Sequence, residues 1–323
     1  MLNQTRQVSE STRLKVLTAA EQLGYRDHRI QELQQEQLVI GVDVPSAANT
    51  FFGEMLAGLD SEAARAGATL LISVTNEDPS REDDAVRALL QRGVDTLVIV
   101  PCHDWRGRSR ARLKNASAAV VLVDRLDDPS FDQVGCSGTA ATESLVRHLI
   151  DRGHTEIGMI TGIPGLTTSN ERLAGYLAAL RGASLPIRKD WIVDGHSTVQ
   201  GGRQAGLDLL RRADRPTAIL CGNNNMTLGF MEALQQAGVS APDEMAFVSF
   251  DDLEWGELMS PGITAVVQPF HAIGSQAIHL ALDQLAHPAR PPRTLRLDCY
   301  IEHRQSCGCA DSAPLTSSWH HRG

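Results

Sequence analysis

Short apolar segments alternate with amphipathic segments along most of this chain. Apolar runs predict buried strands at 38–44, 69–74, 96–100 and 119–123, and the spacing of apolar residues between them predicts helices at 51–67 and 81–93. After Val134 the alternation resumes, with helices expected at 139–152, 168–182, 199–212 and 225–237 and strands at 156–161, 190–194, 217–221 and 245–250. A strand at 263–268, a helix at 270–285 and a strand at 295–300 complete the pattern. Such alternation predicts an α/β fold, with parallel sheets covered by helices on both faces.

The two halves of this pattern resemble each other. "IGV" at 40–42 recurs as "IGM" at 157–159, and "LAGL" at 56–59 recurs as "LAGY" at 173–176, both 117 residues later. The segment 96–100 then resembles 217–221. The repeat predicts two tandem doubly wound subdomains. Such pairs bind small ligands in the cleft between them, beyond the carboxyl ends of their strands.

Composition excludes some locations and partners. No apolar run approaches the roughly 18 residues of a membrane span, and the start of the chain has no basic-then-apolar signal region, so a cytoplasmic protein without membrane contact is expected. The net charge of −9 argues against attraction of the whole chain to nucleic acid, and any such contact must be local.

Cysteines and histidines give little sign of chemistry. Cys102, Cys136, Cys221 and Cys299 lie in or beside apolar stretches, which is typical of buried thiols in a reducing compartment. The pair in Cys307-Gly308-Cys309 could bind metal, but no second Cys/His cluster at ligand spacing accompanies it, so neither a metal nor a cofactor is expected. No catalytic Ser/His/Asp or Cys/His grouping and no Walker-type loop appears, so we do not expect an enzyme.

The chain begins with a helix that has nothing to pack against. Residues 8–25 predict a helix with Ser9 as its N-cap and an apolar stripe of Val16, Ala20 and Leu23. Only seven residues precede it, and the stripe is too narrow to fold alone. Residues 26–37 are polar and rich in Gln, which is typical of a linker.

A family resemblance explains this helix. "VSESTRLKVLTAAEQLGYR" resembles the third helix of the DNA-binding domain in LacI/GalR-family transcription regulators. The segments "RGHTEIGMITGIPGLTTSNERLAGYLAAL", "RPTAILCGNNNMTLGFMEALQQAG", "VSFDDLEWGELMSPGITAVVQP" and "EHRQSCG" resemble the family's effector-binding core, which has the fold of periplasmic sugar-binding proteins. The resemblance implies that most of the helix-turn-helix is missing: either the gene start lies upstream, which we favour, or the protein lacks its DNA reader.

The resemblance also implies a domain organisation. Residues 1–25 would be the remnant of the helix-turn-helix domain and 26–37 the hinge linker. Residues 38–137 with 269–297 would form the N-subdomain of the core, and 138–268 with 298–310 the C-subdomain. Three crossovers would lie near 137, 268 and 297, and 311–323 would be a disordered tail.

Effector-binding residues follow from the same resemblance. Arg172 in "NERLAG" aligns with the family's effector-gripping arginine, and its guanidinium suits paired hydroxyls or a carboxylate. Asp251 and Asn223 follow strands, as does Asp124, a weaker candidate, and Gln268 lies at a crossover. Phe270 offers a ring face to a sugar or belongs to the core. The loop "SAANTFFGEM" contributes the remaining candidates, which are Asn49, Thr50 and Phe51; Thr50 replaces the family's proline, and Asn224 its usual aspartate.

The DNA-contacting part departs from the family. Candidate DNA contacts are Asn3, Arg6, Arg29 and Leu33, but the hinge leucine that enters the minor groove would fall at residue 34, which is Gln34. Residues 1–37 hold five Lys/Arg and five Asp/Glu, and this zero net charge offers little attraction to phosphates. DNA binding is therefore expected only with a complete N-terminus.

Three functions remain in view. The first is a ligand-responsive regulator, a repressor, that binds operator DNA as a homodimer and responds to a sugar or nucleoside-like effector. The second is a headless effector-binding core without DNA binding. The third is a periplasmic-type sugar-binding protein, which predicts a signal peptide and no helix of a DNA-binding domain. The start of the sequence has the opposite features.

Overall fold

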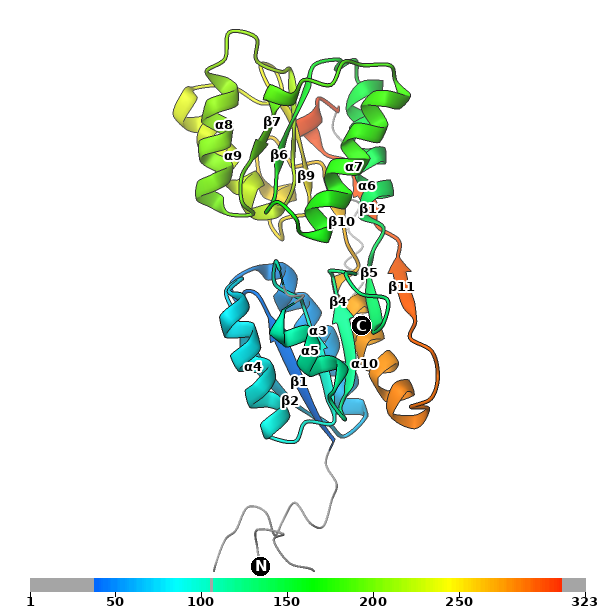
Figure 1. The fold of residues 1–323 in the computed structure, drawn as a ribbon. Coiled ribbons are helices and arrows are strands. Elements are labelled where there is room, and N and C mark those ends of the chain that lie inside the picture. Colours follow the sequence, from blue (N-terminus) through cyan, green and yellow to red (C-terminus); the bar gives the residue numbers. More distant parts are fainter. Residues whose placement is uncertain (1–37, 105–106, 310–323) are drawn as a thin grey trace, which may run out of the picture.

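Two six-stranded sheets, each covered by helices, form two lobes (Figure 1). The structure, a computed structural model, describes residues 38–104 and 107–309. The predicted helix at 8–25, the linker at 26–37, the four candidate DNA contacts and the tail at 311–323 lie outside the described residues. No helix within the described ranges combines the length and the apolar character that a membrane crossing requires.

The first lobe is built on an all-parallel sheet in the order β11-β5-β4-β3-β1-β2. Its strands are β1 (Val39–Val44), β2 (Thr69–Val74), β3 (Thr96–Ile99), β4 (Ala119–Val123), β5 (Asp132–Cys136) and β11 (Thr294–Leu297). One face carries α3 (Thr50–Arg65) and α10 (Phe270–Ala286), and the other carries α4 (Pro79–Gln91) and α5 (Arg108–Lys114). Alternate residues of β3 enter the two cores: Val98 packs under α3 and α10, whereas Leu97 and Ile99 pack under α4 and α5.

The second lobe has a similar sheet in the order β12-β10-β9-β8-β6-β7, in which β12 is antiparallel to its neighbour and the other pairs are parallel. Its strands are β6 (Ile157–Thr161), β7 (Ile192–Asp194), β8 (Ala218–Cys221), β9 (Ala246–Phe250), β10 (Ala265–Val267) and β12 (Tyr300–Glu302). Helices α6 (Gly138–Asp151) and α7 (Thr167–Gly182) cover one face, and α8 (Val199–Leu210) and α9 (Asn224–Ala237) cover the other. Short 3-10 turns lie at Lys189–Trp191, Gly256–Leu258 and Gln305–Cys307, the last called η3. The predicted α/β class with two doubly wound sheets is confirmed.

The glycine of the repeated "LAG" segment has the same structural role in both lobes. Gly58 of α3 lies so close to α10 that a Cβ there would stand 2.1 Å from the carbonyl oxygen of His271. Gly175, its repeat equivalent in α7, would place a Cβ 2.3 Å from the carbonyl oxygen of Thr139 in α6. A contact under 3 Å requires something to shift, so each "LAG" glycine allows two neighbouring helices to approach closely.

The chain passes between the lobes three times. It crosses from β5 to α6 at 137, from β10 to α10 at 268–269, and from β11 to β12 at 298–299. The single strand predicted at 295–300 is therefore wrong. The structure has two strands there, because β11 pairs parallel with β5 of the first lobe and β12 pairs antiparallel with β10 of the second.

Two elements of the first lobe were not predicted. Strand β5 is fully buried but contains polar Asp132 and Gln133, whose side chains are satisfied by Arg290 and Thr294 from a distant part of the chain. Helix α5 has only seven residues, of which two are buried. Neither segment carries the apolar periodicity by which the other elements are recognised.

Candidate functional site

Polar residues follow the strands at the edge where each sheet faces the other lobe. Asp124 comes after β4, Asn223 after β8, Asp251 after β9 and Gln268 after β10. Because β8, β9 and β10 run parallel, their carboxyl ends share one edge of the second sheet. This edge is where open α/β sheets bind ligands.

Arg172 of α7 reaches across this edge. Its Nη1 donates a hydrogen bond of 2.7 Å to the carbonyl oxygen of Gly222, and its guanidinium lies 3.9 Å from the centre of the Phe250 ring. A carboxylate oxygen of Asp251 lies 3.6 Å from Nη1. The side chain is only 12% exposed, and these contacts hold its planar group in one orientation while leaving several N–H donors for another partner.

Asp251 and Gln268 form the second part of this cluster. The amide nitrogen of Gln268 donates to the carboxylate of Asp251, and both side chains are buried. Burial raises the pKa of Asp251, whereas Arg172 and the Gln268 hydrogen bond oppose the rise. Asp251 has a left-handed backbone with φ of 70°, and Ser249 supports it by donating to its carbonyl oxygen at 2.6 Å.

Asp124 brings charge from the first lobe. Burial raises its pKa to about 6, with further contributions from Asp251 and Glu77, while Arg125 and Arg172 oppose the rise. Since Arg172 and Asp251 belong to the second lobe, the charge of Asp124 is coupled across the two lobes. Its neighbour Arg125 is buried and bound to Glu77, with one N–O distance of 2.9 Å.

The amide of Asn223 is already used by the protein. Its oxygen accepts a hydrogen bond of 2.8 Å from the backbone of Met226, so that Asn223 is the N-cap of α9, and its nitrogen donates to the carbonyl oxygen of Ser197 at 3.4 Å. In this structure Asn223 therefore acts as a helix cap. A ligand hydroxyl would have to share these bonds.

The loop before α3 contributes one polar contact and one aromatic cluster. Asn49 caps α3 and exchanges side-chain hydrogen bonds with Asn224 of the second lobe. Thr50 is exposed at the first position of the helix. Phe51 and Phe270 are each about nine-tenths buried or more, and their rings meet edge to face at 4.2 Å within the core of the first lobe. Phe270 is therefore a core residue in this structure, and Phe51 packs in the same core.

The predicted site residues separate into groups. Arg172, Asp251 and Gln268 are in mutual contact through Asp251, and Asp124 is linked to them by charge. Asn49 lies with Asn224, whereas Asn223, Phe51 and Phe270 serve local structure. Two contacts escaped prediction, the Arg125–Glu77 pair and a hydrogen bond from Thr167 of α7 to Asp127 of the first lobe. The partners in these two contacts lie 48 and 40 residues apart in the sequence, so local sequence patterns do not predict them.

The cluster suits recognition of hydroxyl groups. The guanidinium of Arg172 supplies donors, the carboxylate of Asp251 accepts, and the amide of Gln268 does both. An arginine over an aromatic ring, paired with a carboxylate, provides a fixed and partly desolvated surface for a polar small molecule.

Comparisons with known proteins agree with the fold. A family model described as a periplasmic binding protein-like domain matches residues 146–307, half of the chain. The chain is 29% identical over 310 residues to the HTH-type transcriptional repressor PurR of Aliivibrio salmonicida, covering 95% of this chain and 93% of that protein. It is also 29% identical over 308 residues to the ribose operon repressor of Haemophilus influenzae, covering 95% and 92%.

A solved structure gives a similar result. The crystal structure of a candidate ribose operon repressor from Burkholderia thailandensis superposes with a TM-score of 0.74 and is 35% identical, covering 82% of this chain and 98% of that one. These relatives are transcriptional regulators rather than enzymes. The repeated lobes, the triple crossing and relatives matched over nearly their whole length lead to one conclusion: this chain belongs to the LacI/GalR family of transcriptional regulators.

Proposed function

We propose that this protein is a repressor whose affinity for operator DNA changes when a sugar or nucleoside-like effector binds between its two lobes. The observation that carries the proposal is the Arg172–Asp251–Gln268 cluster at the carboxyl edge of the second sheet, with Asp124 of the first lobe coupled to it. Such a cluster offers paired donors and acceptors to adjacent hydroxyls. An effector held there would touch both lobes.

The chemistry of the effector follows from these groups and from the relatives. Relatives include a ribose operon repressor and PurR, and similar folds were solved with bound ribose and with cellobiose. The last two are 23% identical and support the fold alone. Because one of these relatives is a ribose operon repressor, pentoses are the first ligands to test within the polyhydroxylated class, and nucleosides, which contain a pentose, are the second.

Regulation requires that the effector bind two states of the protein unequally. We propose that 38–137 with 269–297 and 138–268 with 298–310 move as two units, and that 26–37 transmits this motion to a DNA-binding head. A homodimer would match a palindromic operator. Ile72 of β2, the outermost described strand of the first sheet, is 53% exposed and offers an apolar contact to a second copy of the chain. Such a regulator acts in the cytoplasm.

A thermal-shift screen of the purified chain tests the effector site. D-ribose, other pentoses, hexoses and purine nucleosides would be compared, since a ligand at a hundred times its Kd adds about 2.7 kcal/mol to the free energy of unfolding. We expect a shift with one of these classes that is absent in Arg172→Ala and in Asp251→Asn. If both variants shift as the wild type does, the effector lies elsewhere.

DNA binding is tested separately. The chain, and a version fused to a helix-turn-helix of the family, would be compared by gel shift on DNA upstream of the gene, with and without the effector. Effector-dependent release of the DNA supports a repressor. If the effector binds but neither version binds DNA, the proposed effector site would stand and the proposed regulation of an operator would be refuted.

A further inference from the structure

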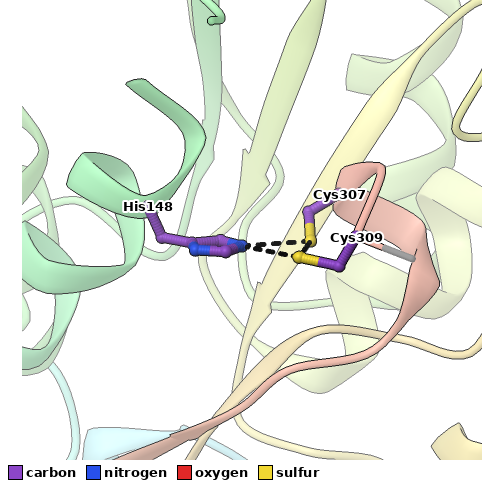
Figure 2. A group of neighbouring side chains, drawn as sticks. All are labelled: His148, Cys307 and Cys309. Atoms are coloured by element: carbon purple, nitrogen blue, oxygen red, sulfur yellow. Dashed lines mark hydrogen bonds between the residues drawn. The ribbon is translucent and has the colours of Figure 1, made fainter. Parts of the chain in front are cut away.

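A compact group of soft metal ligands lies in the second lobe, formed by His148, Cys307 and Cys309 (Figure 2). Nε2 of His148 is 3.2 Å from Sγ of Cys307 and 3.3 Å from Sγ of Cys309, and the two sulfurs are 3.3 Å apart. Figure 2 shows the imidazole of α6 pointing at both thiols, which come from η3 and the residues after it. Three donor atoms thus form a nearly equilateral triangle.

We propose that this triangle is a binding site for a thiophilic metal ion, Zn²⁺ in the first instance. Zinc binds Cys sulfur at about 2.3 Å and His nitrogen at about 2.0–2.1 Å, which sets tetrahedral ligand atoms about 3.5–3.8 Å apart. The triangle need open by only a few tenths of an ångström to accept the ion. Three protein ligands leave the fourth position for water or a further donor.

The backbone and its neighbours prepare this geometry. Gly308 has φ of 80°, a left-handed conformation that turns Cys307 and Cys309 to the same side and that a side chain would strain. Arg152, one residue beyond α6, donates to the carbonyl oxygen of Gly308, so the turn is tied to the helix that carries His148. The ring of His303 packs against that of His148 at 4.3 Å.

The thiols themselves are available. Both cysteines are free, and Cys307 is buried with Thr264 Oγ1 at 3.1 Å from its sulfur. Metal binding at this site would connect the end of the described chain to α6, so it would stabilise the second lobe.

The test uses the full chain, reduced, stripped with a chelator and titrated with ZnCl₂ against a chromophoric competitor. We expect one tightly bound Zn²⁺ per chain and a rise in Tm. Cys309→Ser and His148→Ala should each weaken Zn²⁺ binding at least about 100-fold, as expected for loss of one of three ligands. Co²⁺ should give a thiolate charge-transfer band that Cys309→Ser changes. A Cu⁺ titration of the same proteins then shows which of the two thiophilic ions the site prefers.

Control variants separate this site from other donors. Cys299→Ser removes a partly buried thiol outside the triangle, and a double change of His320 and His321 to Ala removes a histidine pair that lies outside the described residues. Both controls should bind Zn²⁺ as the wild type does. Because Cys309 is partly exposed, Cys309→Ser should fold, and a thermal melt of the metal-free variant checks this. Unaltered Zn²⁺ and Cu⁺ binding in Cys309→Ser and His148→Ala, or no stoichiometric binding by the wild type, would overturn the proposal.

Discussion

The side chains of Asn49 and Asn224 hydrogen-bond each other in both directions across the two lobes. Nδ2 of Asn49 donates to Oδ1 of Asn224 at 3.3 Å, and Nδ2 of Asn224 donates to Oδ1 of Asn49 at 3.1 Å. Asn49 caps the first helix of one lobe, and Asn224 begins α9 of the other. The pair therefore joins two rigid helix starts and favours this arrangement of the lobes.

A double-mutant cycle measures this bridge. Asn49→Ala and Asn224→Ala should each destabilise the described arrangement, and the double variant should lose less than the sum, with a coupling of about 0.5–1.5 kcal/mol. Chemical denaturation gives the coupling, and small-angle scattering should show a larger radius of gyration in the single variants. Strict additivity of the two changes would mean that the pair does not hold the lobes together.

Arg172→Lys tests whether the shape of the guanidinium matters. Lysine keeps the charge but cannot bond Gly222, stack on Phe250 and present a planar donor pair at once, so effector affinity should fall about tenfold, and about a hundredfold in Arg172→Ala. Titration calorimetry with the ligand found in the thermal screen gives both values. Arg203→Ala is the matched control, because Arg203 is half-buried on α8 and forms only a loose ion pair with Glu232, with 3.8 Å between Nε and a carboxylate oxygen. Equal affinity in Arg172→Lys and wild type would remove the guanidinium from recognition.

Gly58→Ala should destabilise the first lobe by about 1–3 kcal/mol, because the added Cβ has no room beside His271. Gly53 lies on the same helix with nothing within 4 Å of an added Cβ, so Gly53→Ala should stabilise by up to about 1 kcal/mol. Urea denaturation compares the two variants. A loss of stability in both would point to a helix-wide effect rather than to the contact with α10.

Asp124 should make stability depend on pH. Burial raises its pKa from the ordinary 3.8 to about 6, so between these values the folded protein holds a proton that the unfolded chain releases. The free energy of unfolding should therefore fall as pH rises through this window, by about 3 kcal/mol in all, and the loss is complete above the folded pKa.

Asp124→Asn should remove this part of the pH dependence. The difference in unfolding free energy between wild type and variant, measured near pH 4 and near pH 7, should change in favour of the variant at the higher pH. Asp60→Asn, a change of an exposed carboxylate on α3, serves as the comparison. A pH profile of Asp124→Asn that overlies the wild-type profile would show that Asp124 titrates normally.

Much of the architecture could be predicted because the spacing of apolar residues indicates where most helices and strands lie. Helix α3 was expected at 51–67 and spans Thr50–Arg65, and the four strands of the first half agree with the structure to within one residue at either end. The ends are less well defined by periodicity. Helix α4 begins at Pro79 rather than at 81 because Asp78 caps it by accepting from Ser80 and Arg81, a signal in the sequence that the apolar pattern does not contain.

The site was only partly accessible from sequence. Strand ends place Asn223, Asp251 and Gln268 at one edge of the second sheet because the parallel strands β8, β9 and β10 share that edge. Asp124 follows a strand of the other sheet, so its coupling to this group depends on how the two lobes meet. Contacts between distant residues are set by tertiary packing and cannot be seen in the local sequence. Asn49 and Asn224 are 175 residues apart, and His148 lies 159 residues before Cys307. Spacing rules for metal sites compare near neighbours, so the expectation of no metal followed from the isolated Cys307-Gly308-Cys309. The sequence leaves Phe270 open between core and site and places Phe51 in the site, whereas in the structure the two rings pack together in the core of the first lobe.

The three passages of the backbone between the lobes have a consequence for how the molecule withstands cleavage. A protease that cut the chain at 137, at 268–269 or at 298–299 would leave the lobes joined by the two other segments and by side-chain contacts such as that of Arg296 in β11 with Glu171 in α7. The same triple tether confines relative motion to bending and modest twisting about one narrow waist. A nicked chain would thus be expected to run as two fragments under denaturing conditions and as one body in native solution.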